Sequence, residues 1–378
     1  MTRQYQICIK CIMDTSDPEI SFDDRGICNH CQKYEAICVS HWISDPSTRA
    51  QALKKVVAEI QSRSSGKEYD CVIGVSGGVD STYVAYMTKK LGLRPLAVHF
   101  DSGWNSELAV KNIENLVKKL SIDLHTFVVD WEEMRDLQLA FFKASVANCD
   151  IPTDHAIIAT LYRVAGEHGI PTIITGQNYA TESILPASWG YTAQDLRHIL
   201  SIHRKFGKAQ LKKYPTLSFF QTYFYYPKMK GIQLVPILNY LDYDKKKAIE
   251  VMSSELAWRD YGGKHFESVF TRFFQSYYLP KKFGFDKRRA HLASLVVSGQ
   301  ISREHALETM QTPPHPEHLL LNDKEFVAKK LGLTTSEFDE ILALENRDFK
   351  DYPSNQALFQ LKAKVGRWIR GFKMKTCV

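Results

Sequence analysis

The stretch Val72–Tyr86, VIGVSGGVDSTYVAY, most constrains how this chain can fold. An apolar segment typical of a buried strand runs directly into Ser-Gly-Gly, and an apolar-spaced helix follows. Glycines let the backbone approach a ligand and adopt positive φ, and a helix N-terminus attracts anions through its free N–H groups. The pattern predicts a loop that binds a triphosphate. The residues assigned to it are Ser76, Gly77, Gly78, Asp80 and Ser81.

Asp80 implies that the loop also binds a cation, because a carboxylate alone would repel phosphate. A bridging cation resolves the conflict, and Mg²⁺ suits hard carboxylate and phosphate oxygens. The loop is neither the G-x-x-x-x-G-K-[ST] form nor the G-x-G-x-x-G form. The simpler alternative is a Gly-Gly turn in which the Asp caps the helix.

Strand and helix patterns alternate around the loop, from a helix at about 48–66 to the strand PTIITG at 171–176. This alternation predicts an α/β fold with a doubly wound parallel sheet, whose ligands bind at the carboxyl ends of the strands. A helix is expected over Asp154–His168, capped by Thr153 or Asp154. Residues 182–234 look irregular and aromatic-rich, and the chain beyond residue 244 looks mostly helical.

Two cysteine pairs mark the first segment, because Cys8-x-x-Cys11 and Cys28-x-x-Cys31 are separated by sixteen residues. Such a spacing predicts four thiolates around one structural Zn²⁺. Four unrelated buried thiols are the alternative, and His30 or Cys38 could be mistaken for a ligand. The two symmetric pairs favour the four-cysteine site.

These patterns divide the chain into four parts. We expect a zinc-binding segment at 1–45, a nucleotide-binding α/β core at 46–240, a helical substrate- and phosphate-binding part at 241–312, and a helical tail at 313–378.

The overall charge leaves several classes of partner open. A net charge of +7 and a pI of about 8.8 suit nucleic acid, but equally a phosphorylated or carboxylated small substrate. The chain has no apolar signal core and no run long enough to span a membrane, so we expect a cytoplasmic protein that binds no membrane.

Further candidates follow the strands or lie in a basic stretch. Gly176 allows close approach after its strand, Gln177 can donate hydrogen bonds, and Glu182 is a second candidate Mg²⁺ carboxylate or a solvated helix-start acid. His155 could orient a substrate or relay a proton, although a structural role is favoured. The basic stretch could neutralise departing pyrophosphate or hold an anionic substrate. Its assigned catalytic residues, besides Asp80, are Lys264, His265, Lys282 and Arg289.

The motif SGGVDS resembles the pyrophosphate-binding PP-loop of the ATP pyrophosphatase superfamily, which has the adenine nucleotide alpha hydrolase-like fold and includes GMP synthetase, asparagine synthetase and tRNA thiolation enzymes. The resemblance implies that Asp101 and Ser102, after the second strand, meet the adenosine; a helix-capping role for Asp101 is the alternative. It also supports Glu182 as a magnesium ligand.

Segments 8–31, 99–116, 130–146, 152–157 and 261–300 look like the N-acetyl sugar amidotransferases, which make acetamidino sugars for O-antigen and other surface glycans. The resemblance extends to about residue 312. It implies that ATP adenylates the amide oxygen of a sugar N-acetyl group, and that ammonia then displaces AMP. Candidate substrates are a UDP-linked diacetamido-mannuronic acid, slightly favoured, and a nonulosonic acid or its precursor.

The same resemblance implies a separate glutaminase subunit and a barrel subunit, similar to the imidazole glycerol phosphate synthase pair, as the source of ammonia. Cys38, Cys71, Cys149 and Cys377 lack a recognisable nucleophile context, so we expect no glutaminase activity in this chain. The main rival is a tRNA-modifying enzyme that thiolates or forms lysidine. It is disfavoured because only Cys149 could serve thiolation and the basic excess is modest, so no nucleic acid partner is expected. A nucleotide-sensing zinc adaptor is the non-catalytic alternative.

Overall fold

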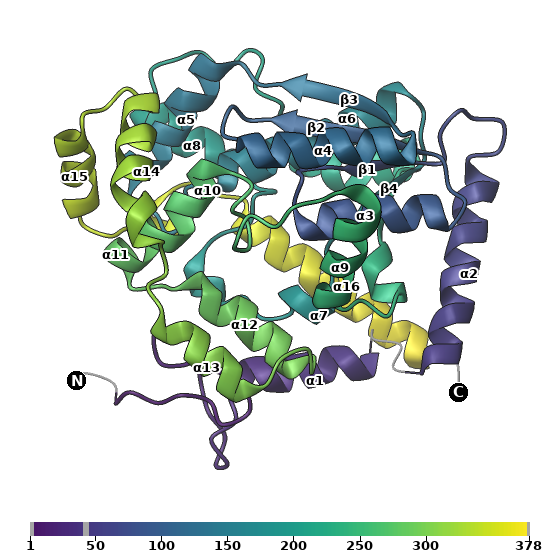
Figure 1. Cartoon of the computed structure of the whole chain (residues 1–378), viewed down its shortest axis with the longest axis horizontal. Helices are drawn as coiled ribbons and strands as arrows, with labels where there is room; N and C mark the ends of the chain where they lie inside the picture. Colours follow the sequence, from purple (N-terminus) through teal and green to yellow (C-terminus); the bar gives the residue numbers. More distant parts are fainter. Residues whose placement is uncertain (1–3, 41–44, 376–378) are drawn as a thin grey trace.

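The computed structural model describes residues 4–40 and 45–375, which fold around a parallel sheet of five strands (Figure 1). The strand order is β3-β2-β1-β4-β5, with the phosphate-loop strand β1 in the middle. The predicted α/β fold with a doubly wound parallel sheet is therefore confirmed. The strands are β1 Cys71–Gly74, β2 Pro95–Asp101, β3 Asp123–Val128, β4 Thr172–Thr175 and β5 Gln233–Pro236.

Helices cover both faces of this sheet, because successive side chains of a buried strand point to opposite sides. Ile73 of β1 lies in an apolar cluster with helices α3 (Val79–Lys90) and α4 (Glu107–Leu120). Its neighbour Val72 lies in another cluster, to which α6 (Ile151–Glu167) contributes. In Figure 1, α3 and α4 lie in front of the sheet. The carboxyl ends of β1 and β4 lead into α3 and α7.

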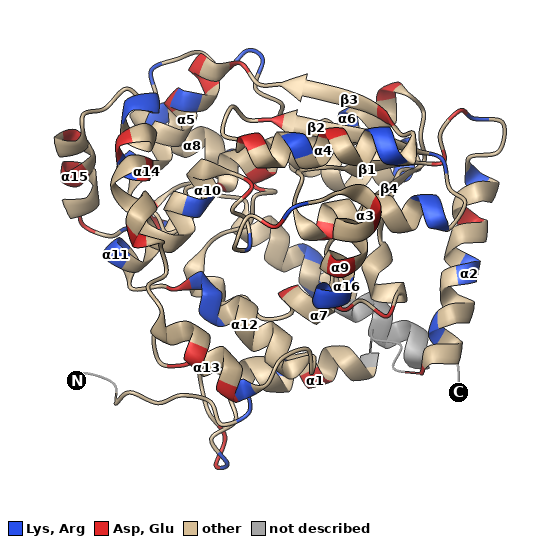
Figure 2. Cartoon of the chain, viewed as in Figure 1, with Lys and Arg blue, Asp and Glu red and all other residues tan. Residues whose placement is uncertain are grey.

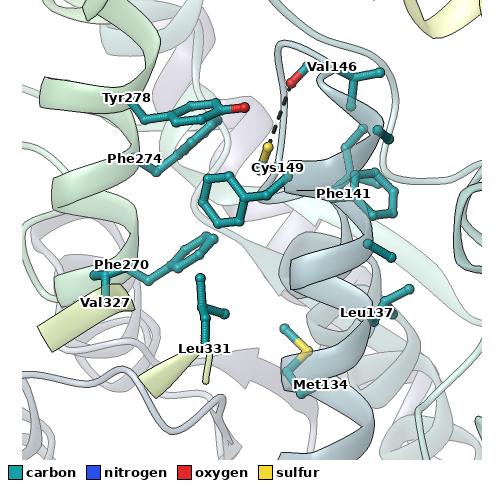
Figure 3. Packing of buried hydrophobic residues seen from close by; sticks show 14 of the residues in the cluster. Met134, Leu137, Phe141, Val146, Cys149, Phe270, Phe274, Tyr278, Val327 and Leu331 are labelled. Carbon is teal, nitrogen blue, oxygen red and sulfur yellow. Dashed lines mark hydrogen bonds between the residues drawn. The ribbon is translucent and has the colours of Figure 1, made fainter. Parts of the chain in front are cut away.

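A second apolar core joins the sheet region to the C-terminal helices (Figure 3). Helix α5 (Trp131–Ala144) packs there with α10 (Val269–Phe273) and α14 (Glu317–Lys330). In Figure 3, Phe270 and Leu331 lie opposite Met134 and Leu137, which belong to α5. The C-terminal helices therefore share a hydrophobic core with the nucleotide-binding part.

A third apolar cluster holds the N-terminal segment against α12 (Lys287–Val297) and α13 (Arg303–Gln311), in the lower part of Figure 1. Ala290 and Ala293 of α12 are fully buried in this cluster. Helix α12 also packs against the short helix α7 (Tyr179–Glu182), which follows β4. It thereby connects the N-terminal segment with the ligand-binding edge of the sheet.

The prediction of an irregular segment over residues 182–234 was wrong in two places. Helix α8 (Leu196–Phe206) has the Asp195 side chain as its N-cap and buries Ile199 against α5. Strand β5 extends the sheet beyond β4, but its four residues are too few for a clear period-two pattern.

Helix α6 begins earlier than predicted. It starts at Ile151, with Asp150 at the N-cap position and Pro152 in the first turn, where proline is well tolerated. Asp154 is therefore a first-turn residue and not the cap, which leaves its side chain available for other contacts.

None of the helices among the described residues combines the length and the apolar character that crossing a membrane requires. Figure 2 shows charges of both signs interspersed over the elements in that view.

The remaining α-helices are α1 Asn29–Ser40, α2 Pro46–Arg63, α9 Lys245–Leu256, α11 Leu279–Phe283, α15 Thr335–Ala343 and α16 Gln356–Lys375. Two π-helical segments cover Gln221–Met229 and Phe274–Tyr278, and 3₁₀ turns cover Ala187–Trp189, Ile237–Tyr240 and Phe349–Asp351.

Candidate active site at the phosphate loop

The loop between β1 and α3 has one position that only glycine fits and a second where a side chain would crowd its neighbours. Gly77 adopts a φ of +79°, and a Cβ there would lie 2.6 Å from the carbonyl oxygen of Ala109. Trp258 holds this glycine from another side, since its Nε1 donates to the Gly77 carbonyl oxygen at 2.9 Å. A Cβ on Gly78 would lie 2.9 Å from Glu267 Oε1. The backbone at Gly77 therefore requires glycine, whereas a side chain at Gly78 would displace the Glu267 carboxylate from the loop.

Hydroxyl groups hold the rest of the loop in place. The Oγ atoms of Ser76 and Ser81 are 3.1 Å apart, and the Gly78 N–H donates to Ser76 Oγ at 3.2 Å. The Val79 N–H donates to the Tyr261 hydroxyl at 3.0 Å. A bound phosphate could accept from these same N–H groups, because they open α3.

Asp80, Glu182 and Lys264 form a charged triad at the loop, although they come from distant parts of the chain. Lys264 Nζ lies 2.8 Å from Glu182 Oε1 and 4.0 Å from Asp80 Oδ2. The Tyr243 hydroxyl donates to the other oxygen of Asp80. Two carboxylates that flank one cation also match the hard oxygen ligands that Mg²⁺ prefers.

Burial and charge pairing act against each other in this triad. Burial raises the pKa of Asp80, and the nearby Glu182 charge adds to the increase while Lys264 opposes it. Burial also acts to raise the pKa of Glu182, but the Lys264 ammonium outweighs it and the net pKa is lowered. The pKa of Lys264 is raised despite burial, because both carboxylates stabilise its charge. Lys264 and Glu182 therefore remain an ion pair at the phosphate loop.

A second group of ionisable side chains adjoins the triad, and apart from Lys287, which belongs to the predicted basic stretch, its members were missed as part of the site. Most of its members lie in the first turns of α6, α9 and α12, where an acid or a lysine in sequence looks like a cap or a surface charge. Their pKa values respond to each other and to the triad: burial lowers the pKa of Lys287, and Asp154 and Asp150 act to raise it. The group consists of Asp150, Asp154, Lys245, Glu267, Lys287 and His291.

His265 connects the two groups. Its φ of 65° is unusual for a non-glycine residue, and its Nδ1 lies 3.9 Å from Glu267 Oε1. Glu267 in turn accepts a 3.4 Å hydrogen bond from Ser76 Oγ of the phosphate loop. The structure thus brings the predicted Lys264 and His265 to the loop through the segment that precedes α10.

The predicted adenosine-binding residues lie at the end of β2 and organise the following turn. Asp101 Oδ1 accepts from the Gly103 N–H at 2.8 Å and from Asn105 Nδ2 at 3.1 Å, and the Ser102 residue is buried. Trp104, in the same turn, is 1% exposed and packs in the core, so it is not available to stack on a base.

Gly176 and Gln177 follow β4 at the same edge of the sheet. A Cβ on Gly176 would lie 3.4 Å from Asp80 Cβ, so this glycine borders the phosphate loop directly. Gln177 is exposed. Both occupy the strand end where the sequence predicted ligand contacts, and their ligand-binding roles stay predictions.

Lys282 and Arg289 lie in other surroundings, where both side chains already have partners. Lys282 Nζ donates to the carbonyl oxygens of Leu342 at 3.1 Å and Leu344 at 2.5 Å, at the end of α15. Arg289 Nη1 donates to the Ile12 carbonyl oxygen at 2.7 Å within the N-terminal segment. The structure does not bring these two residues to the loop with Lys264, and their geometry points to structural roles.

The predicted zinc ligands converge as expected. The Sγ atoms of Cys8, Cys11, Cys28 and Cys31 lie within 4.8 Å of one another. The Cys8–Cys31, Cys11–Cys28 and Cys28–Cys31 sulfur distances are 3.8, 3.7 and 3.7 Å. A tetrahedral site with Zn–S bonds of about 2.3 Å has edges of about 3.8 Å, so this donor set fits Zn²⁺.

His30, the possible competing ligand, lies 2.7 Å from Asp17 instead. Arg303 supports the cysteine cluster from α13, because its guanidinium donates to the carbonyl oxygens of Cys8 and Cys11 at 2.9 Å each. The cluster is thus tied to the same helices that border the active site.

Cys149 and His155, two other candidates from sequence, are held in place by backbone groups. Cys149 is fully buried, its Sγ contacts the Val146 carbonyl oxygen, and burial raises its pKa (Figure 3). His155 Nδ1 lies 2.6 Å from the Ala193 carbonyl oxygen and its Nε2 accepts from the Leu217 N–H. Neither resembles an exposed reactive group, and Cys377 lies outside the described residues.

A cavity of about 700 Å³ lies beside the end of β3 and contains none of the phosphate-loop residues. Arg163, Lys212 and Lys213 line it together with Tyr214. The Lys213 ammonium is already paired with Asp130 at 2.9 Å. The described lining of this cavity contains no member of the charged triad or of the second ionisable group, although the pKa of one lining residue, Tyr214, responds to Asp154.

Comparison with known proteins adds two matches that together cover most of the chain. The family described as NAD synthase matches residues 48–214, and the family described as LPS biosynthesis protein WbpG-like, C-terminal domain, matches residues 267–366. The first match contains the phosphate loop. The second begins at Glu267, which touches that loop.

Individual relatives are more distant. An uncharacterized protein of Methanocaldococcus jannaschii is 24% identical over 279 residues, which are 71% of this chain and 83% of that protein. A glutamine-hydrolyzing GMP synthase of Pyrobaculum aerophilum is 39% identical over 83 residues, which are 22% of this chain and only 16% of the synthase.

Solved structures with local similarity include NMN synthetase from Francisella tularensis, with a TM-score of 0.30 and 20% identity over 53% of this chain and 76% of that one. A predicted tRNA methyltransferase subunit from M. jannaschii has a TM-score of 0.28 and 16% identity over 49% of this chain and 76% of that one.

Proposed function

This chain is an ATP-utilising PP-loop protein with a WbpG-like C-terminal domain, and from that premise we propose that it converts a sugar N-acetyl group to an acetamidino group. The reaction has two steps. The amide oxygen attacks the α-phosphorus of ATP and pyrophosphate leaves, and ammonia then displaces AMP from the resulting O-adenylyl imidate.

The observation that carries this proposal is that both matched regions contribute to one site. Glu267 of the WbpG-like region accepts a hydrogen bond from Ser76 of the PP-loop, and Ser106 donates its N–H to the Glu267 carbonyl oxygen at 2.8 Å. Thr271 donates to Asp150 Oδ2 at 2.9 Å. A domain associated with LPS biosynthesis therefore forms a wall of the ATP-binding site, where a sugar substrate has to meet the α-phosphate.

The chain's own groups suit the first step. The N–H groups of the loop and of α3 bind the β- and γ-phosphates, and Lys264 balances the charge that develops as pyrophosphate departs. Asp80 and Glu182 would hold Mg²⁺, which supplies further charge neutralisation on the phosphates when bound. The four cysteines would hold Zn²⁺ in a closed structural site.

The remaining assignments follow the family resemblance. Ammonia comes from a separate glutaminase with a barrel subunit, and this chain has no glutaminase activity of its own. The substrate is a UDP-linked diacetamido-mannuronic acid or a related surface-glycan sugar. Free ammonium at high pH should bypass the glutaminase.

An isotope experiment tests the reaction. The purified chain is incubated with ATP, Mg²⁺, ammonium and candidate sugars whose acetyl oxygen carries a heavy isotope. We expect the label in the phosphate of AMP, and a sugar mass that has changed by the exchange of oxygen for NH. Amidine that forms without transfer of the label would exclude adenylation of the amide oxygen.

The rival tRNA-thiolation reaction has little support in this site. Thiolation commonly uses a reactive cysteine near the phosphate loop, and the only candidate, Cys149, is fully buried with a raised pKa. RNA that co-purifies with the chain and is modified by it would favour the rival.

A further inference from the structure

When the nitrogen source is ammonium near neutral pH, the proposed reaction needs a group that accepts a proton from it, because ammonium has no free electron pair with which to attack. Five carboxylates belong to the charged groups around the phosphate loop. They are Asp80, Asp150, Asp154, Glu182 and Glu267.

Three of these carboxylates are already engaged on the phosphate side. Glu182 is paired with Lys264 at 2.8 Å, Asp80 accepts from the Tyr243 hydroxyl, and Glu267 accepts from Ser76. The pKa values of Glu182 and Glu267 are lowered, which makes both weak bases. These acids suit charge balance at the phosphates better than proton transfer.

The two remaining acids lie one turn apart at the start of α6. Asp150 is 7% exposed and binds Thr271 through Oδ2, while its buried Oδ1 has no hydrogen bond of normal geometry with any described residue. Asp154 is exposed and accepts no hydrogen bond within the described part of the chain. The pair therefore combines a buried oxygen that lacks a donor with an adjacent carboxylate that a small ligand can reach.

We propose that Asp154 is the general base that takes a proton from the attacking ammonium, with Asp150 beside it as the second carboxylate of the amine-binding side of the site. This inference rests on the proposed function and adds a catalytic residue to it. Lys287 interacts with Asp154 and Asp150, whereas Lys264 pairs with Glu182 and lies near Asp80.

The second step of the reaction begins with proton transfer from ammonium. Ammonium gives one proton to the Asp154 carboxylate, and the freed electron pair of nitrogen forms a C–N bond to the imidate carbon. The C=N π electrons move to the sugar nitrogen, which takes a second proton from the new ammonium centre. The C–O bond then breaks, its electron pair leaves with AMP, and the product is a protonated amidine.

The charges that face Asp154 are compatible with this role. Desolvation by the surrounding protein is the main cause that raises the pKa of Asp154, to about 7, although its side chain stays accessible to solvent. The Asp150 and Glu182 charges add to the increase, while Lys287 and His265 oppose it. A base with a pKa near neutrality suits proton transfer at physiological pH. Tyr214 also packs close enough for its pKa to respond to Asp154, but its hydroxyl donates to the Pro152 carbonyl oxygen.

The test uses the full chain with ATP, Mg²⁺ and the acetamido sugar, and compares Asp154→Asn with the wild type. We expect sugar-dependent ATP–pyrophosphate exchange to stay within roughly threefold, and amidine formation from ammonium near neutral pH to fall by about 10²–10⁴-fold. Hydroxylamine is already neutral at that pH and should restore product formation. The deficit with ammonium should shrink as pH rises, because free ammonia needs no base.

The matched control is Glu167→Gln, an acid at the other end of α6 that pairs with Arg163 and should behave as the wild type. Asp154→Glu should recover part of the activity, and an unchanged unfolding midpoint for each variant excludes misfolding. Equal loss of exchange and amidine formation, or equal loss with ammonium and hydroxylamine, overturns the base assignment in favour of sugar binding. A wild-type chain that yields neither exchange nor amidine overturns the proposed function itself.

Discussion

The cysteine cluster and the phosphate-loop site each bring several polar side chains together, but they are built in opposite ways. The four cysteines come from one short segment, and backbone N–H groups such as those of Lys10 and Met13 donate to their sulfurs. The active site is assembled from at least five distant segments, and buried oxygens of Asp150 and Glu267 have no hydrogen-bond partner in the described structure. The first arrangement serves stability, whereas the second leaves polar capacity free for a substrate.

Asp80→Asn should have the largest effect on activity and so tests whether the phosphate-loop site serves catalysis and not stability. Loss of a charge at the phosphates should lower ATP–pyrophosphate exchange by about 10²–10³-fold. The unfolding midpoint should not fall, because burial already disfavours the charged form of Asp80. Asp242→Asn, at an exposed acid paired with Arg49, is the control. A large drop in stability with Asp80→Asn would break the contrast.

Cys31→Ser should act in the opposite way, mainly on stability. The variant should lose its bound zinc, and a cost of about 3 kcal/mol should lower Tm by roughly 4 °C in a chain of this length. Metal analysis and thermal unfolding measure both effects. Cys38→Ser is the matched control, since this thiol lies outside the cluster. Retained zinc with unchanged Tm would show that the four thiols are not a metal site.

The smallest effect is expected for Lys282→Met, which tests a residue assigned to catalysis from sequence. Its ammonium donates to carbonyl oxygens at the end of α15, so we expect a loss of about 1–2 kcal/mol in unfolding free energy with exchange unchanged. The exposed neighbour Lys281→Met should change stability by less than about 0.5 kcal/mol. A selective loss of exchange in Lys282→Met would restore the catalytic assignment.

The parts predicted best from sequence were those with a local physical signal. The strand–Gly-Gly–helix pattern at Ser76–Ser81 and the periodic helices around it gave the sheet and its ligand-binding edge, and the paired cysteines gave the cluster. The resemblance to PP-loop proteins of surface-glycan biosynthesis was confirmed by the two family matches. Helix α8 and strand β5 were missed because short elements among aromatic residues show weak periodicity.

The basic stretch from Lys264 to Arg289 illustrates what sequence could not distinguish. Lys264 and Lys287 interact with the buried acids around the phosphate loop, while Lys282 and Arg289 support the C-terminal helices and the cysteine segment. All four look alike in sequence, because composition does not reveal which way a helix turns its side chains.

The sequence by itself determined the phosphate loop, the sheet that presents it and the four thiols, because each depends on residues that are close together in the chain. Only the tertiary structure decided which distant charges meet at that loop, including Lys245, Glu267 and the two acids of α6. Their roles depend on burial and on the approach of remote segments, and these are properties of the packed chain that local sequence does not encode.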